Sequence, residues 1–403
     1  MKILYIATSF PKESKGATIY TDLAEALNQK GHEITVAVSE QKRNQSATTL
    51  ETERGFKVLR AVVGDYYDVN IIKKGIVTVL LPFIMKKEIK KHLGKEKFDM
   101  VLFETPPITN AGVVAWAKKQ FKCKSYLMLK DIFPQNGLDL GMLGSGIIGK
   151  VIFNYFKYKE KLLYKTADVI GCMSEGNKKY LLEHNPEISE KKVEIFPNAK
   201  KITEDYICKE YVVRQKLGIP ENACVFLFGG NMGKPQYVEI LASAANEFKN
   251  DENIWFLFVG RGTEKPILAK AIEANNIKNA LLLDNLPREE YEQLTKESDV
   301  GLITLDPRFT IPNYPSRILS YMDYAKPVLA ATDTVTDMKE LIEEADCGEW
   351  VCSADKEAFY KKIKELSADK EKRCRQGENG RSYMKEHFTV DRCVEILERA
   401  DIV

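Results

Sequence analysis

Several patterns that mark common enzyme classes are missing from this chain of 403 residues. It contains no GxGxxG motif of dinucleotide enzymes, no Walker A motif, no GxSxG nucleophile motif and no HExxH zinc motif. Its eight cysteines form no CxxC pair, and its four histidines lie far apart, so no metal site is expected. These absences disfavour standard dehydrogenases, P-loop NTPases, serine hydrolases and zinc enzymes.

The chain also lacks a hydrophobic run long enough to cross a bilayer, which needs roughly 20 apolar residues. The run from Gly75 to Met85 has 11 residues and contains Pro82. The start, MKILYIATSF, has no basic segment and no cleavage site, so it is typical of a first strand rather than a signal peptide. Together with the scattered cysteines, this pattern predicts a cytoplasmic protein.

Net charge is low, at +2, but it is unevenly distributed. Residues 1–200 hold 32 Lys and Arg against 22 Asp and Glu, whereas residues 201–403 hold 28 against 36. The small total gives no reason to expect a nucleic-acid partner. A first half at +10 and a second half at −8 indicate that one domain meets an anionic surface or ligand, unless the asymmetry is chance variation of surface charge.

Residues 71–97 combine an apolar stretch with eight lysines and only two glutamates. An apolar segment flanked by lysines suits a protein that rests on an anionic membrane without crossing it. The alternative is a core helix whose lysines face water. A second aromatic and basic stretch, residues 149–165, has helical spacing and is interpreted as a core-facing stripe.

Strand and helix patterns alternate along most of the chain. Apolar strands are predicted at 2–7, 32–38, 99–104, 125–131, 168–174 and 193–198, and helices at 19–31, 108–120, 147–166 and 176–184. A polar break at 199–210 precedes a second series, with strands at 223–230, 254–260, 280–284 and 299–305. This order predicts an α/β fold of two doubly wound, Rossmann-like domains facing across a cleft.

The domain limits follow from the break. We expect a first domain over residues 1–205 and a second over residues 206–385. A helix at about 386–403 is expected to return and pack on the first domain.

Glycine-rich turns follow the predicted strands, where open α/β sheets bind their ligands. Gly16 follows the first strand, FGGNMGK (228–234) follows the strand at 223–230, and FVGRGTEK (258–265) follows the strand at 254–260. Glycine allows the backbone to approach a phosphate closely. Lys234, Arg261 and Lys265 supply positive charge beside these turns, although each turn alone has a purely structural explanation.

The segment TIPNYPSRILSYMDYAKPVLAATD (310–333) predicts a loop, a helix beginning near Ser316 and a buried strand. The free N–H groups of a helix start form an anion site.

These motifs together resemble the retaining GT-B glycosyltransferases of family 4, and most closely a bacterial polysaccharide-assembly branch that includes fucosamine transferases. The resemblance covers nearly the whole chain. The segments that carry it are LKDIFPQ (129–135), TADVIGCMSEGNKKYL (166–181), PNAK (197–200), GGNMGK, FVGRGTEK, NLPREEYEQL (285–294) and PSRILSYMDYAKPVLAA (315–331).

The resemblance implies transfer of a hexosyl or N-acetylhexosaminyl group from a nucleotide sugar, favoured to be a UDP-sugar, without metal or cofactor. It implies catalytic roles for Lys234, Arg261 and Asp131, and donor binding by Gly16, Asn231, Gly233, Asn285, Leu286, Ser316, Arg317 and Ser320. The implied acceptor is a polyprenyl-diphosphate-linked saccharide of capsule or O-antigen assembly, bound at the inner face of the cell membrane.

Three positions depart from the family pattern, and one of them is Asn231, which stands where many relatives have arginine. Ser320 stands where relatives have a glutamate that bonds the donor ribose, and Pro312 stands where they have a partner acid. These departures keep a second interpretation open, a weakly catalytic protein that binds nucleotide sugars. A UDP-sugar 2-epimerase-like enzyme, which shares the two-domain architecture, is a third.

Overall fold

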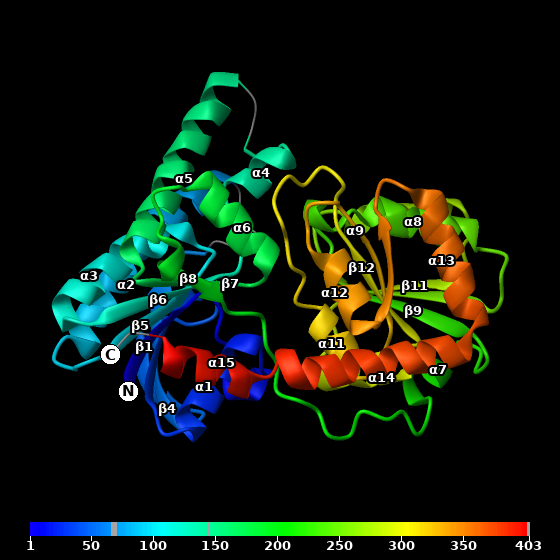
Figure 1. The fold of residues 1–403 in the computed structure, drawn as a ribbon, viewed down its shortest axis with the longest axis horizontal. Coiled ribbons are helices and arrows are strands. Elements are labelled where there is room, and N and C mark those ends of the chain that lie inside the picture. Colours follow the sequence, from blue (N-terminus) through cyan, green and yellow to red (C-terminus); the bar gives the residue numbers. More distant parts are fainter. Residues whose placement is uncertain (66–70, 144–145, 401–403) are drawn as a thin grey trace. The chain divides into compact units, whose positions relative to one another are not determined.

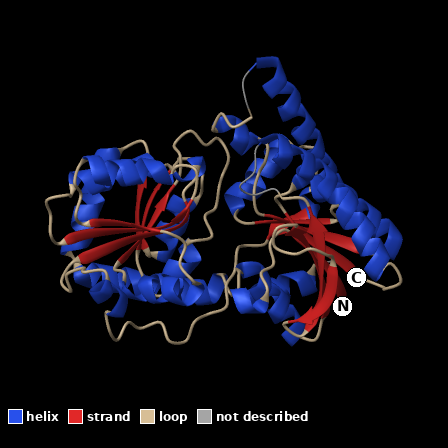
Figure 2. Cartoon of the chain, turned by 180° about the vertical axis from the view of Figure 1, so that it is seen from behind, coloured by secondary structure: helices blue, strands red, loops and turns tan. Residues whose placement is uncertain are grey.

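The computed structural model describes residues 1–65, 71–143 and 146–400, with the side chains of residues 71–74 excluded. The chain forms two compact units (Figure 1). The first unit comprises Met1–Lys200 and the segment that begins at Val390, and the second comprises Lys201–Thr389. Each unit is a central sheet with helices on both faces (Figure 2).

The sheet of the first unit has the strand order β3-β4-β2-β1-β5-β6-β7-β8. Its neighbouring strands pair in parallel except β3, which pairs antiparallel with β4. The strands are β1 (Lys2–Ala7), β2 (Glu33–Gln41), β3 (Thr49–Glu53), β4 (Phe56–Val63), β5 (Met100–Glu104), β6 (Lys124–Leu129), β7 (Val169–Cys172) and β8 (Val193–Ile195).

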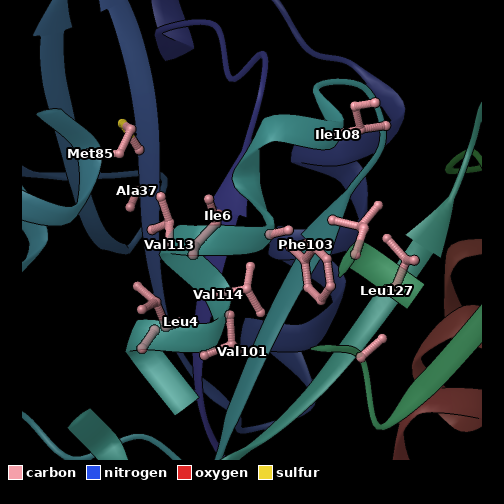
Figure 3. Close-up of a cluster of buried hydrophobic side chains, with 14 of the residues drawn as sticks. Leu4, Ile6, Ala37, Met85, Val101, Phe103, Ile108, Val113, Val114 and Leu127 are labelled. Atoms are coloured by element: carbon pink, nitrogen blue, oxygen red, sulfur yellow. The ribbon is translucent and has the colours of Figure 1, made fainter. Parts of the chain in front are cut away.

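Alternation of side chains along the buried strands gives this sheet two cores. Ile3 and Tyr5 of β1 face one cluster, with α1 (Ile19–Gln29) and α15 (Val390–Arg399). Leu4 and Ile6 face the other cluster, which includes residues of α2, α3 and α5 and is drawn in Figure 3. These helices are α2 (Ile71–Leu93), α3 (Ala111–Phe121) and α5 (Gly146–Thr166). Successive side chains of a strand point to opposite faces of the sheet, and both faces are covered by helices. Each side chain therefore packs against the helices on one face.

Short elements complete the first unit. They are η1 (Glu13–Lys15), η2 (Ile108–Asn110), α4 (Gln135–Asp139), α6 (Glu175–His184) and η3 (Glu190–Lys192).

The sheet of the second unit is parallel throughout, in the order β11-β10-β9-β12-β13-β14. Its strands are β9 (Cys224–Asn231), β10 (Ile254–Arg261), β11 (Ala280–Leu283), β12 (Val300–Thr304), β13 (Val328–Thr332) and β14 (Gly348–Cys352). Its helices are α7 (Val212–Lys216), η4 (Lys234–Gln236), α8 (Val238–Glu247), α9 (Lys265–Ala274), α10 (Arg288–Glu297), α11 (Ile318–Asp323), α12 (Met338–Ala345), α13 (Lys356–Ala368) and α14 (Lys370–His387). The two α/β units with mainly parallel sheets confirm the predicted fold class.

Three features of the fold differ from the sequence-based expectations. The β3–β4 hairpin, which turns at Arg54 and Gly55 with positive φ angles, was not predicted, and neither was β14. The interpretation of residues 149–165 as a core-facing stripe holds only for the second half of the segment, where Leu163 and Tyr164 join the core. The first half of α5 leaves Val151, Ile152 and Tyr155 exposed, because only its second half packs on the sheet.

None of the helices in the described part of the chain is long and apolar enough to cross a membrane. The final helix, α15, packs against α1 in the first unit, and its buried residues include Cys393, Val394 and Leu397. Residues 401–403, which fall within the expected helix at 386–403, lie outside the described residues.

Replacing Leu397 by alanine should lower the free energy of unfolding of the first unit by about 2–5 kcal/mol, because it empties space in a packed cluster. Leu397 is only 1% exposed. Urea unfolding would measure the change. The exposed Glu395 on the same helix is the matched control, and Glu395→Ala should shift stability by less than about 0.5 kcal/mol. Equal effects of the two variants would show that α15 does not stabilise the unit.

Candidate active site

Backbone loops at the carboxyl ends of β9 and β10 lie in direct contact. A Cβ atom built on Gly260, which has a φ of +148°, would sit 1.9 Å from the carbonyl oxygen of Gly230. One built on Gly262 would sit 2.2 Å from the carbonyl oxygen of Met232. Only glycine fits at these two positions, so the pattern FGGNMGK and FVGRG is required by the packing of the two loops as well as by any ligand.

Cationic side chains stand on these two loops. Lys234 begins η4 and Arg261 ends β10, and both are exposed. Asn231 pairs in register with Arg261, and its side chain donates to Gln236 at 3.2 Å. Lys265 differs from Lys234 and Arg261, because its ammonium group contacts Asp284 at 2.5 Å. The net positive charge over the loops therefore comes from Lys234 and Arg261.

Arg317 places a third positive charge beneath the β9 loop. Its guanidinium lies 4.3 Å from the centre of the Phe228 ring, and its Nη2 lies 3.8 Å from the position of a Cβ on Gly230. Nη1 is buried without a hydrogen-bond partner, and among the described residues no carboxylate forms an ion pair with this side chain. Burial lowers the pKa of Arg317 from its ordinary value. Arg317 as a whole is half-buried, and a cation that is partly removed from water without a counter-ion is costly, so this site favours an anion.

Two tyrosines hold the β9 loop in place. The hydroxyl of Tyr321 donates to the carbonyl of Leu227 at 2.9 Å and accepts from the N–H of Gly229 at 3.3 Å. The Tyr291 ring lies against Gly229, where a Cβ would sit 2.0 Å from the Tyr291 hydroxyl. This bracing fixes the backbone that faces the cationic side chains. Neither tyrosine was predicted from the sequence, although both occur in the segments that carry the resemblance.

The predicted helix start at Ser316 is wrong by two residues. The helix α11 begins at Ile318 and has only six residues, so its end is a weak basis for an anion site. The chain around Ser316 forms 3₁₀-like bonds instead, with the N–H of Leu319 donating to the carbonyl of Ser316. Ser316 is exposed and Ser320 is half-buried on α11. The charge of Arg317 thus replaces the helix end as the main anion-attracting feature.

Asn285 and Leu286 follow β11, at the outer edge of the same sheet. Asn285 is exposed and Leu286 is half-buried just before α10. Gly233, by contrast, lies on the β9 loop, where its N–H donates to the side chain of Gln236 at 3.3 Å. The predicted donor residues of the second unit therefore all lie along the carboxyl edge of one sheet.

Gly16 and Asp131 belong to the first unit. Gly16 ends η1 with a φ of +97°, and its carbonyl accepts from the side chain of Arg54. Asp131 follows β6, and the amide of Asn136 donates to its carboxylate at 2.7 Å. Burial raises the pKa of Asp131 to about 6. Such a carboxyl is partly protonated near neutral pH, which suits a group that exchanges protons or orients a hydroxyl.

A second acid, Glu104, lies at the same edge of this sheet and was not identified from the sequence. It ends β5, where the hydroxyl of Tyr5 donates to one carboxylate oxygen at 2.6 Å and the N–H of Thr8 donates to the other at 2.9 Å. Burial raises its pKa to about 7. The sequence feature that could have identified it is one acidic residue at the end of the otherwise apolar run MVLFE.

Lys130 lies between these acids in the sequence and is half-buried. Its ammonium donates to the carbonyl of Pro197 at 3.2 Å and lies 5.2 Å from the centre of the Phe196 ring. Burial lowers its pKa to about 8. The edge thus carries three groups, Glu104, Lys130 and Asp131, that all titrate closer to neutrality than usual.

A hollow of about 200 Å³ opens beside this edge, at the carboxyl ends of β1 and β2. Its lining is mostly polar and includes Thr8, Ser9, Lys12, Glu40 and Asn44. Hydroxyl, amide and charged groups of this kind suit a polar ligand.

Comparisons with known proteins identify the enzyme class. The family model "Glycosyltransferase Family 4" matches residues 16–199, and "Glycosyl transferases group 1" matches residues 211–383. The chain is 22% identical over 364 residues to the putative colanic acid biosynthesis glycosyl transferase WcaI of Escherichia coli, covering 85% of this chain and 86% of WcaI. It is 23% identical over 292 residues to the probable glycosyltransferase WbjE of Pseudomonas aeruginosa, covering 70% and 69%.

Solved structures share the fold over its full length. Sucrose-phosphate synthase from Thermosynechococcus elongatus superposes with a TM-score of 0.78 at 15% identity, covering 99% of this chain and 97% of that one. Anabaena HepE, solved in complex with UDP-glucose, gives a TM-score of 0.69 at 16% identity, covering 99% and 98%. The chain is a GT-B glycosyltransferase. Its family 4 match lies in the first unit and its group 1 match lies in the second.

Within this glycosyltransferase the sequence-predicted residues fall into two groups. The second unit carries Lys234 and Arg261 on the two adjoining loops and the half-buried Arg317 beneath the β9 loop. The first unit gathers Asp131 with Glu104, which the sequence analysis had missed.

Replacing Glu104 by glutamine should change how stability depends on pH. In the unfolded chain this carboxyl titrates near 4.5, whereas in the folded unit its pKa is about 7, so the folded state retains its proton longer. The stability that protonated Glu104 contributes is complete below pH 4.5 and is lost as the pH rises through 7. Wild type should therefore lose about 3 kcal/mol relative to Glu104→Gln between pH 4.5 and 7.5.

Urea unfolding of both proteins at these two pH values would measure the difference. Asp131 is present in both proteins, so its own titration cancels. A stability difference that does not vary with pH would show that Glu104 is already ionised when buried.

Proposed function

We propose that this glycosyltransferase transfers a sugar from a UDP-sugar to a lipid-linked saccharide, with retention of anomeric configuration and without a metal ion. The observation that carries the proposal is the cationic site of the second unit. Arg317 is half-buried beneath the β9 loop without a counter-ion among the described residues, and its Nη1 is buried without a hydrogen-bond partner, while Lys234 and Arg261 stand exposed on the loops beside it. A nucleoside diphosphate brings the negative charge that these three groups lack.

The chemistry follows from that charge. The bond between the anomeric carbon and the donor phosphate oxygen breaks, and the diphosphate leaves with the electron pair. The acceptor hydroxyl oxygen forms the new bond to the anomeric carbon on the same face, and its proton passes to the leaving phosphate. Lys234, Arg261 and Arg317 stabilise the charge that develops on that phosphate, which is usually the largest catalytic contribution.

The preference for uridine rests on the similarity of this chain to HepE and on residues at the carboxyl edge of the second unit's sheet. HepE, which shares this fold, was solved with UDP-glucose. In this chain, Asn285 and Leu286 present backbone groups at the carboxyl end of β11, next to the β10 loop. A base held there leaves the diphosphate over β9 and β10, and Ser320 of α11 is then the nearest candidate for a ribose contact.

The acceptor is assigned to the first unit. That part of the chain carries the excess of lysine and arginine, and it holds the polar hollow and the perturbed acids Glu104 and Asp131. A carboxyl with a pKa of about 6 can orient the reacting sugar through a hydroxyl, which is the role proposed for Asp131. WcaI is named for colanic acid biosynthesis, and by analogy the product here is a surface polysaccharide.

Contact with the inner face of the cell membrane is part of this proposal. In α2 the residues Ile76, Val79, Leu80 and Phe83 form one exposed apolar face, at i, i+3, i+4 and i+7. Exposed lysines at 86, 87, 90 and 91 continue the same helix. A different face of the same helix packs in the core, as the alternative interpretation of this segment expected. That face includes Leu81, Met85 and Ile89. An apolar face beside a lysine cluster favours an anionic bilayer.

Replacing Lys234 by alanine should reduce turnover at least about 100-fold, because the variant loses one positive charge at the leaving phosphate. Incorporation of sugar from radiolabelled UDP-glucose and related UDP-sugars into a membrane-extracted lipid acceptor would measure it. Lys270 is an exposed lysine on α9, so Lys270→Ala is the matched control and should leave turnover unchanged. Wild-type activity in Lys234→Ala would remove this residue from the mechanism.

Replacing Arg317 by methionine should abolish UDP binding without destabilising the free protein. Removal of a half-buried cation that has no counter-ion among the described residues relieves a desolvation cost, so the thermal midpoint without ligand should stay or rise. Wild type should gain about 2.7 kcal/mol at UDP concentrations of 100 times Kd, and Arg317→Met should gain nothing. Thermal unfolding with and without UDP measures both quantities.

Arg214 provides the contrast, since it is fully buried and binds Asp299 and the carbonyl of Glu297. Arg214→Met should cost about 3–5 kcal/mol. A comparable loss of stability in Arg317→Met would mean that Arg317 is structural. Absence of any UDP-sugar shift in wild type would instead favour the weakly catalytic or non-catalytic interpretation raised by Ser320 and Pro312.

A further inference from the structure

The first unit carries a second exposed apolar surface, at the start of α5. Ile147 is 84% exposed, Ile148 is 75% exposed and Val151 is 63% exposed. These are among the most exposed large apolar side chains of the described chain, and they occupy two successive turns of one helix. Single exposed aliphatic residues are ordinary, but a contiguous group indicates a binding surface.

This surface projects beyond the neighbouring helix α3 on the same face of the sheet. The helices α3 and α5 end together, since the ammonium of Lys118 in the last turn of α3 donates to the carbonyl of Thr166 at 2.7 Å. With 11 and 21 residues, α3 and α5 differ in length by about 15 Å. The start of α5 therefore extends past the carboxyl edge of the sheet, and Figure 1 shows it rising above its neighbours within the unit.

Burial along α5 agrees with this overhang. Its second half contributes Leu163 and Tyr164 to the core, whereas in its first half only Gly149 is buried. Phe156, near the middle, is half-buried and contacts the ring of Phe133 at 5.0 Å between centroids. The helix is thus anchored at one end and unsupported by the core at the other.

Side chains along α5 are sorted by polarity. The aliphatic tip is followed by exposed Tyr155 and Tyr158, and then by Lys159, Lys161 and Lys165. Lys159 lies over both tyrosine rings, at 5.4 and 5.9 Å from their centres. This is the order of the layers of a bilayer surface: acyl chains, an interface that favours tyrosine, and anionic headgroups that attract lysine.

We propose that the first two turns of α5 insert tip first into an anionic bilayer and hold the carboxyl edge of the first unit's sheet toward the lipid. This inference rests on the proposed membrane-bound acceptor, since it seats Glu104 and Asp131 on the side where a lipid-linked saccharide arrives. It adds an insertion element to the membrane contact assigned to residues 71–97. Lys150 is the one charged residue within the tip, and its long side chain can extend to the headgroups.

Charge disfavours a second copy of the chain as the occupant. The only acid on α5 is Glu160, which is buried and bound by Lys157 at 2.6 Å and by Tyr164 at 3.0 Å. The charges that α5 presents to solvent are therefore lysines, and two such helices would repel each other. An anionic lipid surface complements them.

Vesicle sedimentation of the full chain, without donor or acceptor, tests the insertion. Wild type should bind vesicles of phosphatidylglycerol and phosphatidylethanolamine more strongly than pure phosphatidylcholine. The triple variant Ile147→Ser, Ile148→Ser, Val151→Ser should bind the anionic vesicles at least about tenfold more weakly, because it loses buried apolar area. The matched control changes three exposed aliphatic residues of the second unit, Ile207→Ser, Val212→Ser and Val335→Ser, and should bind like wild type.

Fluorescence quenching by brominated lipids tests the orientation. Residues 147 and 158 are separated by about 16 Å along the helix. With tip-first insertion, Ile147→Trp is quenched by bromine deep in the acyl chains, and Tyr158→Trp only by bromine near the headgroups. Equal depths for the two would overturn tip-first insertion and indicate a helix lying flat.

Three further outcomes overturn the proposal. In the first, the wild type does not bind anionic vesicles, and in the second, the triple variant binds them as strongly as the wild type does. In the third, the wild type self-associates and the triple variant does not, while both bind vesicles equally. The UDP-induced thermal shift, measured on the same variants, should be unchanged. If UDP causes no thermal shift in the wild type, the result counts against the proposed donor. If the wild type shows the shift but does not bind vesicles, the result counts against the insertion alone.

Discussion

The close approach of the β9 and β10 loops is the constraint on which the second unit depends. Gly230 and Gly260 meet backbone to backbone, and Gly230, which has no side chain, also lies close to the guanidinium of Arg317. Tyr321 and Tyr291 contact the same strand end and fix it. The geometry places Lys234 and Arg261 on two adjoining loops and Arg317 beneath one of them before any ligand is present. The protein thus accepts an electrostatic cost in its free state, which a bound anion would relieve.

The sequence predicted most of the fold because the local signals agree with the tertiary structure. Buried strands such as β1 and β9 are short apolar runs bounded by polar turns, and their order along the chain implies a parallel sheet. The β3–β4 hairpin was missed because β3 is an exposed edge strand of mixed composition, TLETE, with no apolar face. The start of α11 was misplaced because Pro315 and Ser316 resemble a helix start but form only a 3₁₀-like turn.

The candidate site was less predictable, because charge and burial depend on partners that are distant in sequence. Lys265 looks like Lys234 in the sequence, yet only the structure shows that Asp284, 19 residues away, neutralises it. Glu104 was missed because its importance arises from Tyr5 and Thr8, which lie about 100 residues earlier. Arg317 was found through a motif, but its lack of a counter-ion is a property of the packed fold alone.

Periodicity shows which residues of a helix share a face, but it does not show what covers that face. In α2 two apolar stripes alternate, one covered by the sheet and one exposed, while in α5 a single helix passes from exposed to buried along its length. The uneven charge of the chain gains meaning from this arrangement. The lysines of α2 and α5 follow exposed apolar turns on the same side of one sheet, which is difficult to attribute to chance variation of surface charge. An excess of basic residues that is ordered in this way, next to an edge with perturbed acids, favours a single anionic surface as the partner of the first unit.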